Sequence, residues 1–458
     1  MMQFVAGSIA SRGSRFTLSV GLVLIGLAGM SASVYADSWP QWGGPKRDCV
    51  WRETGIVKTL PKTSSGLMPR VWSTPLGEGY AGPAVGDERQ PSGGRAWSPV
   101  VITDFTDRNF SRGQERVQCL RADDGKVVWQ HSYPVQYDIS YPAGPRATPV
   151  FDGDRVYTIG ATGKMFCFNI DSGEILWQKD FQEDYKTQLP TWGMASSPLV
   201  DGDQLITLVG GADGATLVSF EKTTGKELWR AIDDPAIGYA PPVIYTYGGT
   251  RQLILWHPRA ITSLDPSNGK IYWQFPFAVQ AGLTVPMPRQ QGDRLFVTAF
   301  YNGPRMLQVS GGEEPSATLL WKGNSNSETR TDKLHSIMPT PIFEKDYIYG
   351  ICSYGQLRCL DARTGERVWE TYEATGEGRW WNAFLIPNGD RVFIHNEQGD
   401  LIIANLSPKG YEEISRAKLV EPTRPVGRRM TIWSHPAFAL KSVFARNDKE
   451  IVRVNLAE

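Results

Sequence analysis

Seven stretches of the chain concentrate the side chains best suited to binding chemistry. Their tryptophans and tyrosines would stack on a planar ligand, and their arginines would hold an anion through charge-assisted hydrogen bonds. A histidine among them would supply a base. The stretches are YDISYPAGPRATP (137–149), LPTWGMASSP (189–198), AIGYAPP (236–242), AGLTVPMPR (281–289), DKLHSIMPTP (332–341), EGRWWNAF (377–384) and TIWSHPAF (431–438).

From these stretches we select nine candidate residues for a planar, anionic ligand. The alternative is that the same side chains only pack a wall and hold neighbouring elements together. The candidate residues are Arg146, Trp192, Tyr239, His335, Arg379, Trp380, Asn382, Trp433 and His435.

The sequence contains no motif for nucleophilic catalysis and no cluster of metal ligands. No G-x-S-x-G nucleophile motif occurs, and the five histidines and five cysteines form no cluster at metal-ligand spacing. We therefore predict no metal site formed by such a cluster. We interpret the cysteines mainly as small buried hydrophobic residues.

A repeat defines the elements that must position the candidate residues. Five stretches align without gaps on a glycine that is followed four residues later by a tryptophan. The tryptophans from Trp129 to Trp369 recur at intervals of 44 to 52 residues, with Trp321 ending a degraded copy. The aligned stretches are CLRADDGKVVW (119–129), CFNIDSGEILW (167–177), SFEKTTGKELW (219–229), SLDPSNGKIYW (263–273) and CLDARTGERVW (359–369).

Each repeat predicts four short antiparallel strands. Apolar runs flank DG or GD hairpin signals, as in ATPVFDGDRVY, and the shared glycine marks a tight turn that needs positive φ. We expect a structural role for this glycine, and for the tryptophan burial against the next repeat with its indole N–H donated. Four strands in roughly 45–50 residues make one propeller blade.

Counting the blades predicts an all-β fold, an eight-bladed β-propeller of four-stranded antiparallel blades. The last C-terminal copy has three strands, and RVWSTPL (70–76) resembles the missing fourth. We therefore expect an N-terminal strand to close the ring in the last C-terminal blade, which removes a free sheet edge. In such a ring the seven stretches enter equivalent inner strands, so their side chains converge at one mouth of the central channel.

The N-terminus indicates export. Arg12 and Arg15 precede an apolar run of about 15 residues, short of the roughly 20 that span a bilayer, and Val34 and Ala36 form a cleavage pattern. We predict a signal peptide (1–36) cleaved after Ala36, an N-terminal extension (37–69) and the propeller (70–458). The protein is then periplasmic or extracellular, with no integral membrane segment after processing.

The charge balance limits the classes of partner that we expect. Lys plus Arg equals Asp plus Glu, at 48 each, which gives no support for nucleic acid as a partner. We expect an envelope protein, a small planar or anionic ligand, or a carbohydrate.

The motif A-x-D-x-x-T-G-x-x-x-W resembles the signature of the PQQ-repeat, or quinoprotein alcohol dehydrogenase-like, β-propellers, and CLDARTGERVW matches it closely. The segment WPQWGGPKRDCVW (39–51) is similar to the mature start of an exported bacterial group in this family. The family also includes the propeller lipoprotein of the outer-membrane assembly machine. The resemblance implies the fold and allows pyrroloquinoline quinone with Ca²⁺ as a cofactor.

The chain departs from the dehydrogenases of that family. It lacks the adjacent Cys–Cys pair that they commonly carry beneath the quinone, and it has no C-x-x-C-H haem motif. The preferred hypothesis is therefore a binding or scaffolding protein of the cell envelope. The alternatives are a quinone-dependent dehydrogenase that oxidises an alcohol or sugar, with Asp138 or a histidine as base, and a polysaccharide hydrolase or lyase.

Overall fold

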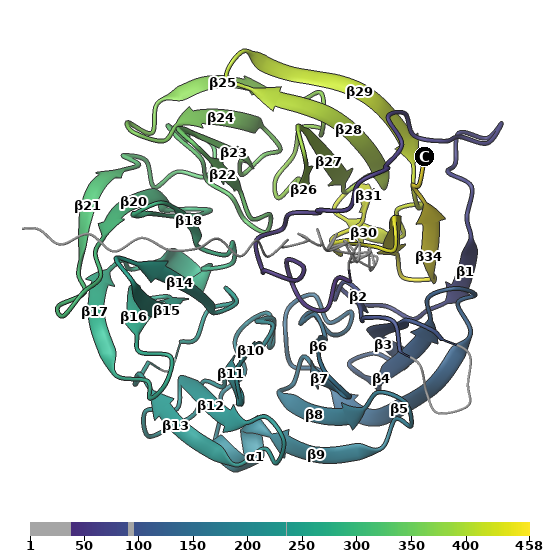
Figure 1. The fold of residues 1–458 in the computed structure, drawn as a ribbon, viewed down its shortest axis with the longest axis horizontal. Coiled ribbons are helices and arrows are strands. Elements are labelled where there is room, and N and C mark those ends of the chain that lie inside the picture. The colour runs from purple at the N-terminus through teal and green to yellow at the C-terminus, as the bar shows by residue number, and fades with distance from the viewer. Residues whose placement is uncertain (1–37, 90–95, 235) are drawn as a thin grey trace, which may run out of the picture. The chain divides into compact units, whose positions relative to one another are not determined.

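The computed structural model describes residues 38–89, 96–234 and 236–458. The predicted signal peptide and its cleavage site lie outside these residues. Within them, strands dominate, and the helices are α1 (Phe181–Tyr185) and a 3-10 turn, η1 (Gln280–Gly282). Eight four-stranded antiparallel sheets surround a central axis (Figure 1), so the predicted eight-bladed β-propeller is confirmed.

Blades 1 to 4 follow one another along the chain, each from an inner to an outer strand. Their strands are β2 (Ala84–Val85), β3 (Pro99–Asn109), β4 (Arg112–Arg121) and β5 (Val127–Gln136); β6 (Val150–Asp152), β7 (Arg155–Ile159), β8 (Lys164–Asn169) and β9 (Ile175–Asp180); β10 (Leu199–Asp201), β11 (Gln204–Leu208), β12 (Leu217–Glu221) and β13 (Glu227–Ala231); β14 (Val243–Tyr247), β15 (Thr250–His257), β16 (Ala260–Leu264) and β17 (Ile271–Pro276).

Blades 5 to 7 repeat this order, and blade 8 takes its outer strand from the N-terminal part of the chain. Their strands are β18 (Arg289–Gln291), β19 (Arg294–Ala299), β20 (Gly303–Val309) and β21 (Ala317–Lys322); β22 (Ile342–Glu344), β23 (Tyr347–Ile351), β24 (Leu357–Asp361) and β25 (Arg367–Thr371); β26 (Ala383–Asn388), β27 (Arg391–Asn396), β28 (Asp400–Ser407) and β29 (Gly410–Lys418); β32 (Ala437–Ala439), β33 (Ser442–Arg446), β34 (Glu450–Asn455) and β1 (Trp72–Pro75).

The ring closes where β1 pairs with β34. The strands are antiparallel, with Trp72 opposite Arg453, which confirms the predicted N-terminal closing strand. Arg446 of β33 strengthens the junction with blade 1. Its buried guanidinium donates to the carbonyl oxygens of Thr103 at 2.8 Å and Gly77 at 2.5 Å.

The repeated glycine and tryptophan form one contact between neighbouring blades. The ring of Trp129 lies against Gly173 of blade 2, and its indole N–H donates to the Ile170 carbonyl of that blade at 2.6 Å. Gly173 has φ +73°, as the tight turn requires. The ring-on-glycine contact recurs as Trp72–Gly125, Trp177–Gly225, Trp229–Gly269 and Trp321–Gly365.

Small residues sit across the strand from the tryptophans. Cys119 pairs with Trp129 in the antiparallel register, and Cys167, Cys359 and Ser219 hold the equivalent place. All five cysteines are free, and all but Cys49 are buried, as expected for small core residues. One buried apolar cluster combines Tyr157 of blade 2 with Leu205 of blade 3, so the apolar core lies between the blades.

The N-terminal segment packs inside the ring instead of standing apart from it. Residues 38–57, which we call the plug, cross the axis in Figure 1. The Trp39 amide donates to Val85 in blade 1 at 2.8 Å, and the Trp51 amide donates to Pro387 in blade 7 at 2.9 Å. Arg47 is buried and donates to the Pro198 carbonyl at 2.7 Å. One short segment thus ties blades on different sides of the channel.

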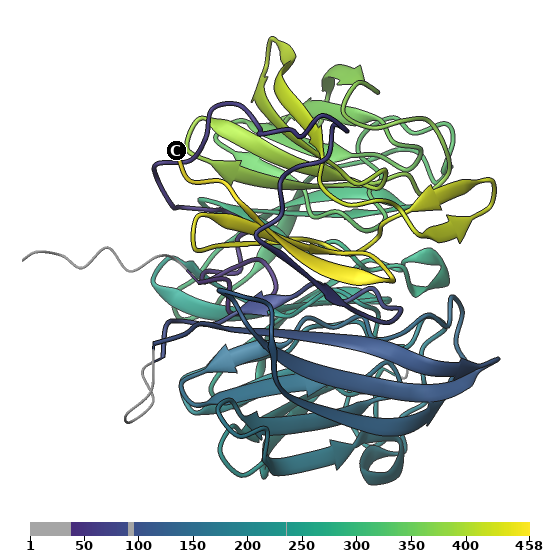
Figure 2. The same cartoon turned by 90° about the vertical axis from the view of Figure 1, so that its right-hand side faces the viewer.

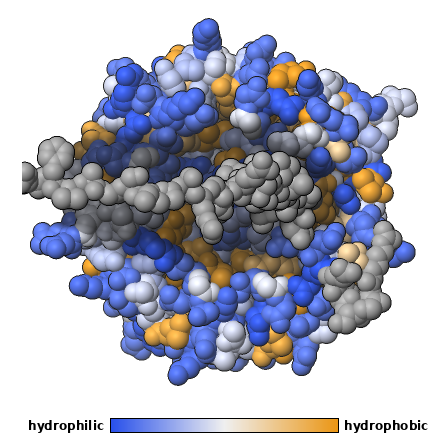
Figure 3. All heavy atoms as spheres, in the orientation of Figure 1, coloured by the Kyte–Doolittle hydropathy of each residue, from blue (hydrophilic) through white to orange (hydrophobic). Residues whose placement is uncertain are grey.

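Two hairpins project from the end of the ring opposite the plug (Figure 2). One is the long β3–β4 hairpin of blade 1. The other is the pair β30 (Arg424–Val426) and β31 (Arg429–Thr431), which stands outside the blades in the connection from β29 to β32. Figure 3 shows the plug end, where the rim is mainly hydrophilic and apolar side chains appear toward the hollowed centre. None of the helices in the described residues has the length and apolar character to cross a membrane.

Candidate functional site

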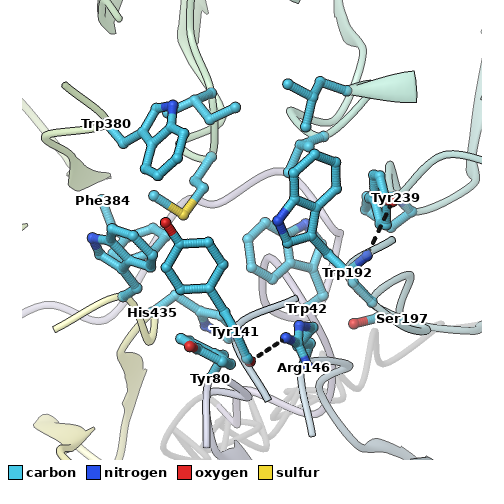
Figure 4. Close-up of a pocket in the computed structure, with 17 residues that line it drawn as sticks. Trp42, Tyr80, Tyr141, Arg146, Trp192, Ser197, Tyr239, Trp380, Phe384 and His435 are labelled. Atoms are coloured by element: carbon cyan, nitrogen blue, oxygen red, sulfur yellow. Dashed lines mark hydrogen bonds between the residues drawn. The ribbon is translucent and has the colours of Figure 1, made fainter. Parts of the chain in front are cut away.

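A cavity of about 200 Å³ opens at the channel end opposite the plug (Figure 4). The loops that lead into the inner strands form its wall, as the repeat predicted. The plug contributes to it through Trp42, whose ring meets the His435 ring edge-on with centroids 4.4 Å apart. The lining residues are Trp42, Tyr80, Tyr141, Arg146, Trp192, Ala195, Ser197, Tyr239, Pro241, Leu283, Val285, Ile337, Met338, Trp380, Phe384, Trp433 and His435.

Six of the nine candidate residues lie in this wall. They come from five connections that are far apart in the sequence, and the ring brings them together. The six are Arg146, Trp192, Tyr239, Trp380, Trp433 and His435.

The other three candidates lie behind or beside the wall. His335 is completely buried, and its Nδ1 is 3.1 Å from the Phe300 carbonyl oxygen. Asn382 is also completely buried. Arg379 lies at the rim, where it pairs with Glu328 at 2.7 Å and its guanidinium lies 4.4 Å from the Trp380 ring centre. Burial removes the first two from contact with a ligand, and Arg379 shapes the rim through Trp380.

Arg146 is the one charged side chain among the residues that line the cavity. Its Nη1 donates to Gly144 O at 2.8 Å, and its Nη2 donates to Ser140 O at 2.9 Å and Tyr141 O at 2.6 Å. No carboxylate of the described residues lies within ion-pair distance of it, and burial holds its pKa below the usual value. The cavity wall therefore carries a positive charge without a carboxylate partner.

His435 is held as a neutral ring. Its Nε2 lies 2.6 Å from the Thr148 hydroxyl and its Nδ1 lies 3.3 Å from the Pro436 carbonyl, so Nδ1 donates and Nε2 accepts. Burial lowers its pKa to about 4, because the charged imidazolium would lose its hydration. Both ring nitrogens are engaged, so His435 acts as a wall residue.

A polar network orients the aromatic rim from behind. The Trp433 indole N–H donates to the buried carboxylate of Glu397 at 3.0 Å, and Glu397 pairs with Arg429. Burial raises the pKa of Glu397. The guanidinium groups of Arg146 and Arg424 both lie near the Tyr80 ring, 4.8 Å and 4.4 Å from its centre.

Two of the rim aromatics have a strained backbone. Tyr141 has φ +53° and Trp380 has φ +65°, a region that bulky residues rarely adopt. Their rings meet edge-on with centroids 5.9 Å apart. Such strain is typical of binding sites, where the surrounding structure holds a side chain in a required position.

Sequence reasoning missed several lining residues. Tyr141 and Phe384 lie inside two of the predicted stretches but were not selected among the many aromatics there. Trp42 and Tyr80 lie outside all seven stretches, and only the frequency of tryptophan in WPQWGG marked the first. Asp138 is exposed and lies outside the cavity wall.

The donor set of the cavity does not match the quinone with calcium that the resemblance allowed. Ca²⁺ takes roughly six to eight oxygen ligands, mostly carboxylates and carbonyls, and the lining contains no carboxylate. The quinone is itself a tricarboxylate, and Arg146 alone would meet it. Elsewhere in residues 38–89, 96–234 and 236–458, no three His, Cys, Asp or Glu side chains are grouped to hold a metal.

Eight four-stranded blades closed into a ring, with the repeated glycine–tryptophan contact at five of the eight junctions, define a PQQ-repeat β-propeller. The sequence profile described as outer membrane protein assembly factor BamB matches residues 113–371 and 213–449. The chain belongs to this family.

One curated relative is named as an assembly factor. Outer membrane protein assembly factor BamB of Yersinia pestis is 23% identical over 222 residues, which cover 46% of this chain and 51% of the relative. The match thus spans about half the length of this curated relative.

Two solved dehydrogenases share the fold. A europium-containing methanol dehydrogenase aligns with a TM-score of 0.59 and 11% identity, over 90% of each chain. Quinohemoprotein alcohol dehydrogenase of Comamonas testosteroni aligns with a TM-score of 0.56 and 12% identity, over 91% of this chain and 80% of that chain. At these identities the likeness extends to the fold alone.

Proposed function

We propose that this protein is a noncatalytic binding and scaffolding propeller of the bacterial cell envelope, and that the mouth cavity is where it holds its partner. The observation that carries this proposal is the composition of the wall. It contains aromatic rings, one arginine and a neutral, fully engaged histidine.

The wall lacks a group suited to proton transfer. A general base needs a pKa near the working pH and access to the proton that it takes. His435 has a pKa of about 4 and uses both nitrogens within the protein. Rings that exclude water and a fixed cation favour recognition instead.

The envelope setting rests on the family and on the N-terminus. The Yersinia pestis relative is named as an outer membrane assembly factor, and the first 36 residues match the pattern of a cleaved signal peptide. We therefore place the mature protein in the periplasm or outside the cell. Its partner there is an envelope protein, with a small planar anion or a carbohydrate as the other ligands that the aromatic wall would accept.

A photo-crosslinking experiment tests the role of the mouth. A benzoylphenylalanine would replace Tyr141 at the rim, and a matched variant would carry it at Asp390, in the exposed turn between β26 and β27 at the plug end. Irradiation of cells should give a discrete adduct from position 141 and none from position 390. Adducts of equal yield from both positions would contradict a binding site at the mouth.

The dehydrogenase alternative has a direct assay. The purified protein is mixed with pyrroloquinoline quinone, Ca²⁺ and an alcohol or a sugar, and reduction of an electron-accepting dye is followed. We expect no rate above that of the same mixture without protein. A quinone-dependent rate that Trp380→Gly reduces would overturn the noncatalytic assignment.

A further inference from the structure

We propose that the mouth cavity binds a small aromatic monoanion, with its ring between the aromatic walls and its anionic group on Arg146. This inference rests on the proposed function, because both assign ligand binding to the mouth. It adds the chemical class of the ligand.

Arg146 determines the charge of the ligand. Three of its five N–H groups donate to backbone carbonyls, which leaves the Nε–H and one Nη1–H without an acceptor among the described residues. The carboxyl group of Glu115 interacts with it only beyond ion-pair distance and is engaged by Tyr137 and the Ala161 amide. A partly buried cation with free donors favours an anion and repels a cation.

The walls determine the shape of the ligand. The cavity of about 200 Å³ is smaller than the roughly 300–1,000 Å³ of pockets that hold drug-sized molecules. It suits a single ring or a fused bicycle with a short substituent. Trp192 and Trp380 project into it from separate loops, and aromatic rings prefer offset or edge-on contact with another ring (Figure 4).

The polar groups of the wall disfavour a sugar. The Tyr239 hydroxyl is 3.4 Å from the Trp192 amide, the Tyr80 hydroxyl accepts from Arg424, and the Ser197 hydroxyl accepts from the Thr148 amide. Each of these hydroxyls therefore has one acceptor position occupied and offers a sugar mainly its own O–H. Because much of the remaining wall is apolar, a saccharide would bury several hydroxyl groups without partners, at a cost of about 1–3 kcal/mol for each.

Arg146 also connects the charge to the strained rim. The same guanidinium that would meet the anion donates to the carbonyl oxygen of Tyr141, one of the two aromatics with positive φ. Trp380 is the other aromatic with positive φ, and its backbone amide donates to the Ser353 carbonyl oxygen at 3.0 Å. The cation and the two rings are thus positioned before a ligand arrives, which reduces the entropy lost on binding.

The test compares aromatic anions with neutral amides of nearly the same shape, and adds an aromatic cation and a sugar as further probes. Calorimetry on the purified protein would use indole-3-acetate and phenylacetate as anions, their primary amides as neutral isosteres, phenethylamine as a cation and glucose as a sugar. We expect each anion to bind at least about 10-fold more tightly than its amide, and the cation and glucose to bind more weakly than either.

A matched pair of variants removes the preference without altering Arg146. Ala195 lines the cavity, so Ala195→Asp adds a negative charge there, and Ala195→Asn adds nearly the same shape without charge. We expect Ala195→Asp to abolish the preference for the anion and Ala195→Asn to keep it. Arg146→Gln should act like Ala195→Asp, while Arg112→Gln, on the exposed β3–β4 hairpin, should change nothing.

Three results would overturn the inference: equal affinity for anion and amide, tighter binding of the cation or glucose, or no binding of any aromatic probe. Loss of anion preference in Ala195→Asn as well as Ala195→Asp would show a steric effect and would also reject it. The crosslinks from position 141 are measured independently of these probes. If they persist while the anions fail, the proposed function stands and only this ligand class is rejected.

Discussion

The indole ring of Trp129 lies against Gly173 of the following blade so closely that a Cβ on Gly173 would come within 2.7 Å of the ring. The glycine and the tryptophan are the two positions that recur most regularly in the aligned repeats. In the structure, the tryptophan of one blade packs on the glycine of the next. The two repeated positions occur together because each blade must pack against both the blade before it and the blade after it.

Substitution of this glycine should therefore destabilise the ring in two ways. Gly173→Ala combines about 1–2 kcal/mol for a side chain at positive φ with about 1–3 kcal/mol for overpacking against Trp129. We expect a loss of about 2–5 kcal/mol in the free energy of unfolding, measured by urea denaturation.

Gly153→Ala is the matched control. Gly153 has φ +59°, but no atom of the described residues lies within 4 Å of its added Cβ. It should lose only the backbone contribution of about 1–2 kcal/mol. An equal loss in the two variants would show that the tryptophan contact is loose enough to adjust.

Removal of the Arg446 donors should weaken the closure of the ring. Arg446→Met keeps most of the volume but leaves the carbonyl groups of Thr103 and Gly77 without their donors. We expect a loss of about 2–4 kcal/mol, because buried acceptors lose charge-assisted bonds. Arg367→Met, which removes an exposed pair with Glu370, should stay within about 0.5 kcal/mol. A similar loss in both variants would contradict a special role for the junction.

The buried histidines predict lower stability in mild acid. His435 and His395 have pKa values of about 4 in the folded protein, against roughly 6.5 in an unfolded chain. As the pH falls from about 6.5 to about 4, the unfolded chain takes up protons that the folded chain refuses. The free energy of unfolding then falls, by up to about 3 kcal/mol for each histidine.

Urea denaturation at pH 7, 6, 5 and 4 checks this slope. His435→Gln should flatten it, while His131→Gln, on the outer strand β5, should change it less because His131 is only partly buried. The raised pKa values of Glu115 and Glu397 make the free energy of unfolding rise as the pH falls, opposite to the effect of the histidines. The comparison of the variants therefore isolates the contribution of the histidine. An unchanged slope in His435→Gln would contradict the assignment of a neutral, buried ring.

The strain at Trp380 predicts a separation of stability from binding. Trp380 has a φ of +65°, a backbone strain of about 1–3 kcal/mol that the Trp380→Gly substitution relieves. The substitution also removes a ring that is only partly buried. We expect the free energy of unfolding to change by less than about 1 kcal/mol, while crosslinking from position 141 falls. Trp433→Gly has no such relief and also breaks the bond to Glu397, so it should lose more stability. Equal losses would indicate that the strain has little energetic weight.

The repeat made the fold predictable in detail. Trp129 and its counterparts set the spacing of the blades, and RVWSTPL supplied the strand that the last copy lacked. These inferences hold because antiparallel strands joined by short turns are local in sequence, and because a sheet of four strands needs a neighbour on each face. The same reasoning placed seven loops at one mouth and brought six of nine candidate residues into the cavity wall.

The remaining three candidates show where that reasoning ends. His335 and Asn382 stand in loops of the expected kind, but the backbone turns their side chains into the protein. Nothing in the stretches DKLHSIMPTP or EGRWWNAF distinguishes a side chain that faces the axis from one that faces the neighbouring blade. That choice depends on the φ and ψ angles of each loop, which its packing decides.

Sequence by itself determined the periodic part of this protein: the number of blades, the closing strand and the turn that holds each glycine. Only the tertiary structure decided that the plug supplies Trp42 to the cavity, that Arg146 lies there beyond ion-pair distance of every described carboxylate, and that His435 is sealed in a neutral form. The physical reason is the separation along the sequence of the residues that contact one another. Repeats are specified by contacts between neighbours along the chain, whereas the mouth is formed by residues hundreds of positions apart that meet only when the ring closes.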